Sequence, residues 1–279
     1  ILPRKPIFYP FKYLEVILRL FLLIPKFGKR IIYHGHDLPA AFPLLIIGKL
    51  LGKKVIYDSH ELYTEQDENF NSLYNKIWRF IEKKILNSFS IVIAVNDSRS
   101  DIMKSEYGLL KRPQVIGNYP EKYLEVKIKT KYLSDYIKTR NGAVDGKIVL
   151  YQGGLDENRS LKALIEAFNY VMTDVHLILM GPDTSNGLDY EAIIKKNQLS
   201  SRVFIHPAVK SAELLNVVSS ADLGVVIYKN NCRNNLLCAP NKIFEYIASD
   251  IPIIGSNLPE ISKVVDSNEI GLLFEENKA

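Results

Sequence analysis

The stretch CAPNKIFEYIASDIP, from Cys238 to Pro252, decides how the second half of the chain folds. Pro240 has no backbone N–H and a φ already close to helical, so it predicts a helix that begins at about this residue. The free backbone N–H groups of the first turn, on Asn241, Lys242 and Ile243, would point along the axis with the positive end of the helix dipole, which favours a phosphate. Lys242 adds a full positive charge there. The residues IPIIG after the helix predict a short buried strand.

Polar and apolar residues divide this helix into two sides. Glu245 lies one turn beyond Asn241 and Lys242 and on the same face. Its carboxylate would repel a phosphate, but it can accept two hydroxyl donors, as the diol of a ribose provides. The alternative is an ordinary amphipathic helix with solvated charges. The side expected to be buried consists of Ile243, Phe244, Ile247 and Ala248.

Apolar runs alternate with helical patterns along both halves, which predicts two parallel, doubly wound α/β domains. We expect an N-terminal domain over 1–121, a charged linker poor in core residues over 122–145, and a C-terminal domain over 146–279. Ligands usually bind at the carboxyl ends of such strands. The expected helices cover 11–23, 40–51, 72–86, 98–107, 188–196 and 212–219, with others beginning at 159 and 240; the expected strands cover 30–33, 54–58, 90–95, 114–118, 147–154, 176–181, 202–206 and 221–228.

Composition excludes several classes of protein. The chain has 279 residues, of which 47% are hydrophobic and 24% charged, as in globular proteins. Its two cysteines, Cys232 and Cys238, form neither a disulfide framework nor a zinc pattern, which favours free thiols in the cytoplasm. Residues 1–140 hold 24 Lys and Arg against 14 Asp and Glu, whereas the rest hold 12 against 17. The basic half predicts peripheral contact with an anionic membrane at its inner face rather than with nucleic acid; solubility alone is the alternative.

A second candidate site follows the strand KIVLYQGG. Gly153 and Gly154 at its carboxyl end would let a diphosphate approach the backbone. Arg159, at the start of the next helix, could clamp the diphosphate through two N–H donors. A tight turn with a surface arginine is the alternative.

Histidines mark the strand ends of the first half. His34 and His36 share a face of their strand while Asp37 points away, and no second ligand pair follows, so we expect no metal there. The chain also lacks an Asp-x-Asp sequence that would hold a metal-bound nucleotide sugar. His60 is the better functional candidate, with Asp58 and Glu61 beside it; a structural role is the alternative for His34 and His36.

The motif P-N-K-x-F-E-Y, followed by a strand and Leu-Pro-Glu, resembles the donor site of retaining GT-B glycosyltransferases of family 4. Y-Q-G-G-L with Arg159 resembles the donor-phosphate loop of that family, and the resemblance extends over 30–274. It implies two Rossmann-like domains facing a cleft, and metal-independent transfer of a sugar from a nucleotide-diphosphate sugar to a glycan or lipid-linked acceptor. Glu245 and His60 would be the catalytic residues, with His60 facing the donor sugar across the cleft. The backbone near Gly181 and Phe204 would hold the base.

The chain departs from the family pattern at several positions. Many members carry an arginine where Gly154 stands and a lysine one residue after Arg159, and the first glutamate of their two-glutamate motif is Leu237 here. The pattern also includes an earlier strand and helix and later helices, so we expect an incomplete N-terminal domain. Two alternatives remain open: a non-catalytic glycosyltransferase-like subunit, and a nucleotide-sugar epimerase of the same fold.

Overall fold

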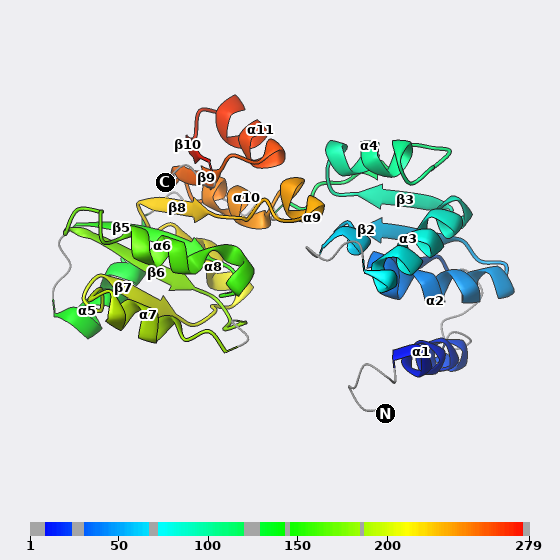
Figure 1. Cartoon of the computed structure of the whole chain (residues 1–279), viewed down its shortest axis with the longest axis horizontal. Coiled ribbons are helices and arrows are strands. Elements are labelled where there is room, and N and C mark those ends of the chain that lie inside the picture. The colour runs from blue at the N-terminus through cyan, green and yellow to red at the C-terminus, as the bar shows by residue number, and fades with distance from the viewer. Residues whose placement is uncertain are drawn as a thin grey trace. The chain divides into compact units, whose positions relative to one another are not determined.

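A computed structural model of the chain describes residues 9–23, 31–66, 72–119, 129–142, 146–184 and 187–275. The chain divides into two compact units (Figure 1). Unit 1 is Ile1–Asn118 with Cys232–Asn234, and unit 2 is Tyr119–Asn231 with Asn235–Ala279. Each unit contains its own parallel sheet, as the sequence predicts.

The sheet of unit 1 has four strands in the order β1–β2–β3–β4, which is also their order along the chain. A helix follows each of the first three strands, as in a βαβ unit. The strands are β1 (Tyr33–His36), β2 (Val55–Ser59), β3 (Ile91–Ala94) and β4 (Gln114–Val115), and the helices are α1 (Tyr9–Leu23), α2 (Asp37–Leu50), α3 (Leu73–Ile85) and α4 (Asp97–Ser105), with short 3₁₀ turns η3 (Tyr63–Glu65) and η4 (Leu86–Ser88).

The first strand lies three residues later than predicted. Gly35 allows this, because a Cβ at that position would lie 2.5 Å from the Cα of Ala41 in α2. The strand therefore runs through the two histidines and close against the helix. Its register with β2 sets His36 opposite Asp58.

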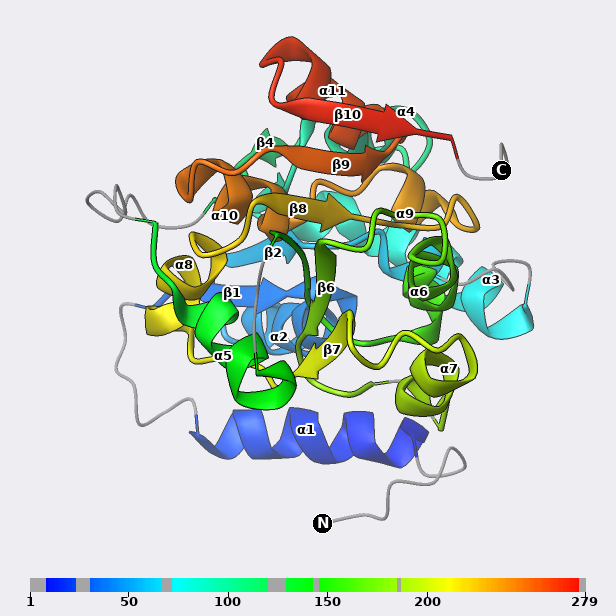
Figure 2. The ribbon, with the colours of Figure 1, turned by 90° about the vertical axis from the view of Figure 1, so that its left-hand side faces the viewer.

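The sheet of unit 2 has six parallel strands in the order β10–β9–β8–β5–β6–β7 (Figure 2). The order reverses between β5 and β8, which is the switch point where doubly wound sheets bind ligands. The strands are β5 (Lys147–Gln152), β6 (Val175–Met180), β7 (Val203–His206), β8 (Leu223–Val226), β9 (Ile253–Ser256) and β10 (Gly271–Phe274). The helices are α5 (Tyr132–Asn141), α6 (Leu161–Ala167), α7 (Tyr190–Lys196), α8 (Ser211–Val218), α10 (Asn241–Ala248) and α11 (Pro259–Ser267), with the 3₁₀ turn η5 (Glu157–Arg159). The short helix α9 (Arg233–Leu236) is divided between the two units.

Two hydrophobic clusters cover the two faces of this sheet. One cluster joins α5, α8, α10 and α11 to the strands, and the other joins α6 and α7 to the opposite face. In Figure 2, α5, α8 and α10 lie on one side and α6 and α7 on the other. The stretch 122–145, expected to be a linker poor in core residues, contains helix α5, whose Leu133 and Ile137 are fully buried in the first cluster. The sequence did not reveal this because charges surround these two residues.

Candidate functional site

A pocket of about 410 Å³ opens in unit 2 at the switch point of the sheet. Its volume lies in the range of small-molecule sites. Loops after β5, β6, β7 and β8 line it together with the start of α10. Five residues that the sequence singled out are among the lining: Gly153, Gly181, Asn241, Lys242 and Glu245.

Two glycines bring the loops of β5 and β6 into contact. Gly153 has a φ of +131°, which favours glycine, and its N–H donates to the carbonyl of Met180 at 3.0 Å. A Cβ on Gly181 would lie 1.8 Å from the carbonyl oxygen of Gly153, so no other residue fits without moving the loop. This part of the pocket is consequently lined by backbone, as the approach of a diphosphate requires.

The helix α10 begins as the sequence predicts, with one difference. Pro240 is the N-cap residue, with φ −72° and ψ 141°, and the helix proper starts at Asn241. The N–H of Ile243 donates to the carbonyl of Pro240 at 3.1 Å, so it is not available to a ligand. The prediction of a free Ile243 N–H is therefore wrong.

Tyr246 fixes α10 against the sheet. Its buried hydroxyl accepts from the N–H of Gln152 at 3.2 Å and donates to the carbonyl of Leu150 at 3.0 Å. Gly224 of β8 makes room for the ring, because a Cβ there would lie 2.5 Å from it. The buried side predicted for α10 is wrong at Ile247, which is 43% exposed, and at Ala248, which is also exposed, since Tyr246 supplies the anchor instead.

Lys242 is the most unusual residue of the pocket. Its side chain is buried, with Nζ 4.0 Å from the ring centroid of Tyr151 and 5.4 Å from that of Tyr228. The guanidinium of Arg159 lies over the same Tyr228 ring, 4.1 Å from its centroid. Burial, and then the charge of Arg159, lowers the pKa of Lys242 to about 7. Two cations thus share one aromatic ring, and an anion bound between them would relieve their repulsion.

Glu245 is half-buried beside these cations. Its carboxylate accepts a hydrogen bond from Nε2 of Gln152. Burial raises the pKa of Glu245, and the charge of Lys242 opposes this. Sequence reasoning missed Gln152, although its position before two glycines at a strand end was a signal. Its Oε1 is buried without a hydrogen-bond partner in the part of the chain that the structure describes.

Three of the residues predicted for the donor site do not line the pocket: Gly154, Arg159 and Phe204. Arg159 lies over the ring of Tyr228, which does line it. A Cβ on Gly154 would lie 3.0 Å from Oγ1 of Thr184, which does not line the pocket either. Phe204 is buried in the hydrophobic cluster of α5 and α8, and Ala208 and Val209 after β7 line the pocket instead. The predicted end of this strand at residue 206 is confirmed, but Phe204 lies inside β7, and the chain reaches the pocket only four to five residues later.

The histidines of unit 1 form a separate cluster around Asp58. Oδ2 of Asp58 lies 3.2 Å from Nε2 of His34, 3.1 Å from Nδ1 of His36 and 3.2 Å from Nε2 of His60. The sequence analysis found no second ligand pair after His34 and His36; strand register, which spacing cannot give, brings Asp58 beside them. The expectation of no metal there stays a prediction. The prediction that His60 faces the donor sugar involves both units, so it stays a prediction.

Comparisons with known proteins agree with this division of the chain. Residues 2–119 match the family described as Glycosyltransferase Family 4, and residues 146–279 match Glycosyl transferases group 1. The chain is 27% identical over 121 residues to TuaH of Bacillus subtilis (strain 168), provisionally named a teichuronic acid biosynthesis glycosyltransferase. That alignment covers 43% of this chain and 29% of TuaH.

Solved structures share the fold at low sequence identity. Sucrose-phosphate synthase from Thermosynechococcus elongatus superposes with a TM-score of 0.75 at 18% identity, over 100% of this chain and 68% of that one. HepE from Anabaena, in complex with UDP-glucose, gives a TM-score of 0.70 at 16% identity, over 95% of this chain and 68% of HepE. The chain therefore consists of two glycosyltransferase domains with the GT-B fold. No helix among the described residues is long and apolar enough to cross a bilayer.

Proposed function

We propose that the chain is a retaining glycosyltransferase that moves a sugar from a nucleotide-diphosphate sugar to a glycan or lipid-linked acceptor in polysaccharide synthesis. The observation that carries the proposal is the pocket of unit 2, in which Lys242, Gly153 and Glu245 meet at the switch point of the sheet. The two glycosyltransferase family matches support the reaction class. HepE, which shares the fold, has been solved with UDP and with UDP-glucose, so UDP is the first nucleotide to test.

The donor would lie across the pocket with its negative diphosphate near the cations and its ribose hydroxyls near the carboxylate. The diphosphate would approach Gly153 and Lys242, where Lys242 and Arg159 lie over the same Tyr228 ring. The ribose hydroxyls would reach Glu245, whose carboxylate Gln152 holds in place. Cations supplied by side chains make a metal unnecessary at this site.

The chemistry proposed is a front-side substitution. The bond from the anomeric carbon to the diphosphate oxygen breaks while the bond to the acceptor oxygen forms on the same face. The acceptor proton passes to the leaving phosphate. Lys242 and Arg159 would stabilise the charge that grows on the diphosphate, and their contribution is electrostatic rather than acid–base.

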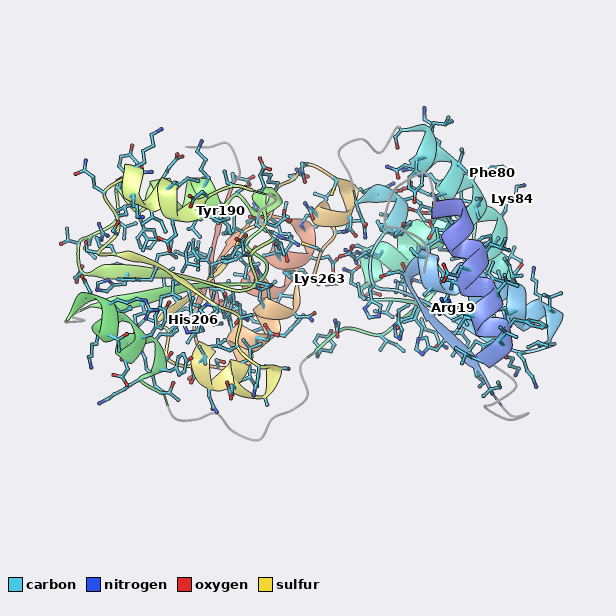
Figure 3. The ribbon with its side chains drawn as sticks, turned by 90° about the horizontal axis from the view of Figure 1, so that it is seen from below. Arg19, Phe80, Lys84, Tyr190, His206 and Lys263 are labelled. Atoms are coloured by element: carbon cyan, nitrogen blue, oxygen red, sulfur yellow. The ribbon has the colours of Figure 1, made fainter. Side chains whose placement is uncertain are left out.

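Unit 1 would serve the acceptor from the cytoplasmic side of a membrane. Its helix α3 exposes Leu73, Ile77 and Phe80, with Lys84 Nζ 5.6 Å from the Phe80 ring centroid. Figure 3 shows Phe80 and Lys84 on α3. Exposed apolar side chains beside a lysine suit an anionic lipid surface. Phe80→Ser should reduce co-sedimentation with phosphatidylglycerol vesicles, and binding by the variant equal to that of the native protein would contradict this placement.

Calorimetric titration of UDP, GDP and ADP tests the donor site. One nucleotide should bind, and Glu245→Ala should weaken it by about 1.5–3 kcal/mol through loss of a charged hydrogen-bond acceptor. Glu213→Ala, on the exposed first turn of α8, is the matched control and should bind normally. No binding by any nucleotide to the folded protein would favour a non-catalytic subunit.

Product analysis separates the two enzymatic alternatives. With a bound UDP-sugar and an acceptor, NMR should show a product whose anomeric configuration equals that of the donor. Isomerised donor in the absence of acceptor would instead identify an epimerase.

A further inference from the structure

Three imidazoles and one carboxylate converge at the carboxyl ends of β1 and β2 in unit 1. The distances from Oδ2 of Asp58 to the three nearest ring nitrogens are 3.1–3.2 Å. Nδ1 of His36 also lies 3.0 Å from Nε2 of His60. The ligating atoms of His34, His36 and Asp58 all lie within 4.8 Å of one another.

The surrounding fold holds this cluster in place. The Asp37 carboxylate accepts from the backbone N–H of His60 at 3.0 Å and from that of Glu61 at 3.2 Å. Arg99 donates to the carbonyl of His60. The loop after β2 is thus tied to the start of α2 on one side and to α4 on the other. Such second contacts are what orient the ligands of a metal.

Hydrogen bonding alone satisfies the cluster poorly. A neutral imidazole has one N–H and one lone pair, so the nitrogens of His36 and His60 that face each other cannot both donate to Asp58 without their protons meeting. Three donors would also compete for one carboxylate oxygen. A cation removes this conflict, because the nitrogens of His34 and His36 that bind it then present lone pairs instead of protons.

We propose that His34, His36 and Asp58 form a site for Zn²⁺, with His60 beside the fourth position. The inference goes beyond the proposed sugar transfer and does not depend on it. At a Zn–N distance of 2.0–2.1 Å, neighbouring ligand atoms of a tetrahedral ion lie about 3.3–3.4 Å apart, close to the 3.1–3.2 Å from Oδ2 of Asp58 to the nitrogens of His34 and His36. Mixed imidazole and carboxylate ligands favour zinc over magnesium or calcium.

The arrangement leaves the ion accessible. The Asp58 side chain is 12% exposed, whereas those of His34 and His36 are 44% and 60% exposed. A fixed carboxylate beneath two open imidazoles lets the metal enter from solvent. Three protein ligands leave one position for a water or for an oxygen of a bound ligand, as in catalytic zinc sites.

The test measures zinc on the purified protein after dialysis against metal-free buffer. One equivalent of Zn²⁺ should remain, and His36→Gln should weaken its affinity by at least about 10- to 100-fold. His34→Gln is a second variant, since its half-exposed side chain can be changed without disturbing the core. Glu61→Gln, in the same loop, should leave the affinity unchanged.

Substitution with Co²⁺ identifies the ligands directly. Its visible spectrum should be that of a nitrogen and oxygen site and should disappear in His36→Gln but not in Cys232→Ser. Three results would each overturn the assignment. The first is a thiolate absorption band that disappears in Cys232→Ser, and the second is zinc binding that neither histidine change affects. The third is a folded native protein without bound zinc.

Discussion

Lys242→Met should make the protein more stable while it weakens nucleotide binding. The pKa of Lys242 falls from 10.5 to about 7 because its ammonium is buried beside Arg159. That difference of about 3.5 units at 1.36 kcal/mol each corresponds to a penalty of about 5 kcal/mol when the buried group is protonated. Methionine fills the same volume without charge. It loses the contact with the Tyr151 ring, worth about 1–2 kcal/mol, so the net gain should be a few kcal/mol.

The pH dependence of this gain has a definite sign. Between pH 7 and pH 10.5 the unfolded chain keeps the Lys242 proton and the folded chain does not, so native stability rises with pH across this window. The penalty is full below pH 7. The advantage of Lys242→Met should therefore shrink by about 3 kcal/mol from pH 6 to pH 9.

Urea unfolding followed by circular dichroism at both pH values gives the measurement. Fluorescence of Trp78, the single tryptophan, follows unit 1 separately and should not change. Lys196→Met, at the exposed end of α7, is the matched control. A Lys242→Met protein no more stable than the native one at pH 6, or one with an equal advantage at both pH values, would refute the reasoning. UDP should bind the variant about 10- to 100-fold more weakly.

Three further variants test buried contacts: two concern Tyr246 of α10 beside the pocket, and one concerns Glu82 of α3 in unit 1. Tyr246→Phe leaves the buried Leu150 carbonyl without its hydroxyl donor and should cost about 1–3 kcal/mol in urea unfolding, with weaker UDP binding; an unchanged affinity would mean that α10 is fixed by other contacts. Gly224→Ala should cost about 1–3 kcal/mol through its clash with the same ring, and a neutral result would show that α10 shifts freely. Burial raises the pKa of Glu82 to about 7, against 4.5 when unfolded, so native stability should fall by about 3 kcal/mol from pH 4.5 to pH 7. Glu82→Gln, which can still accept from Tyr57, should remove that slope, and a slope retained in the variant would contradict the assignment.

The sequence predicted two parallel α/β sheets and five of the residues that line the pocket of unit 2. Gly153, Lys242 and Glu245 could be found because each lies near a strand end or in the first turns of a helix. Neighbouring residues in the sequence identify such places and indicate which way the groups there point. The burial of Lys242 could not be found, because it depends on the Tyr151 and Tyr228 rings that strand order brings to it.

Long-range register explains the other differences. Asp58 joins the histidines only because β1 and β2 pair with His36 opposite it. Phe204 was expected near the base because the turn after β7 could not be measured from sequence; the chain continues to Ala208 and Val209 before it reaches the pocket. Helix α5 was missed since only two of its residues, Leu133 and Ile137, are in the core.

A crystal structure of the protein with UDP tests the central claim most directly. The account predicts density for the diphosphate beside Gly153 and Lys242, with the ribose hydroxyls within hydrogen-bond distance of the Glu245 carboxylate. UDP bound elsewhere, or bound in this pocket with its phosphates away from Lys242, would contradict it.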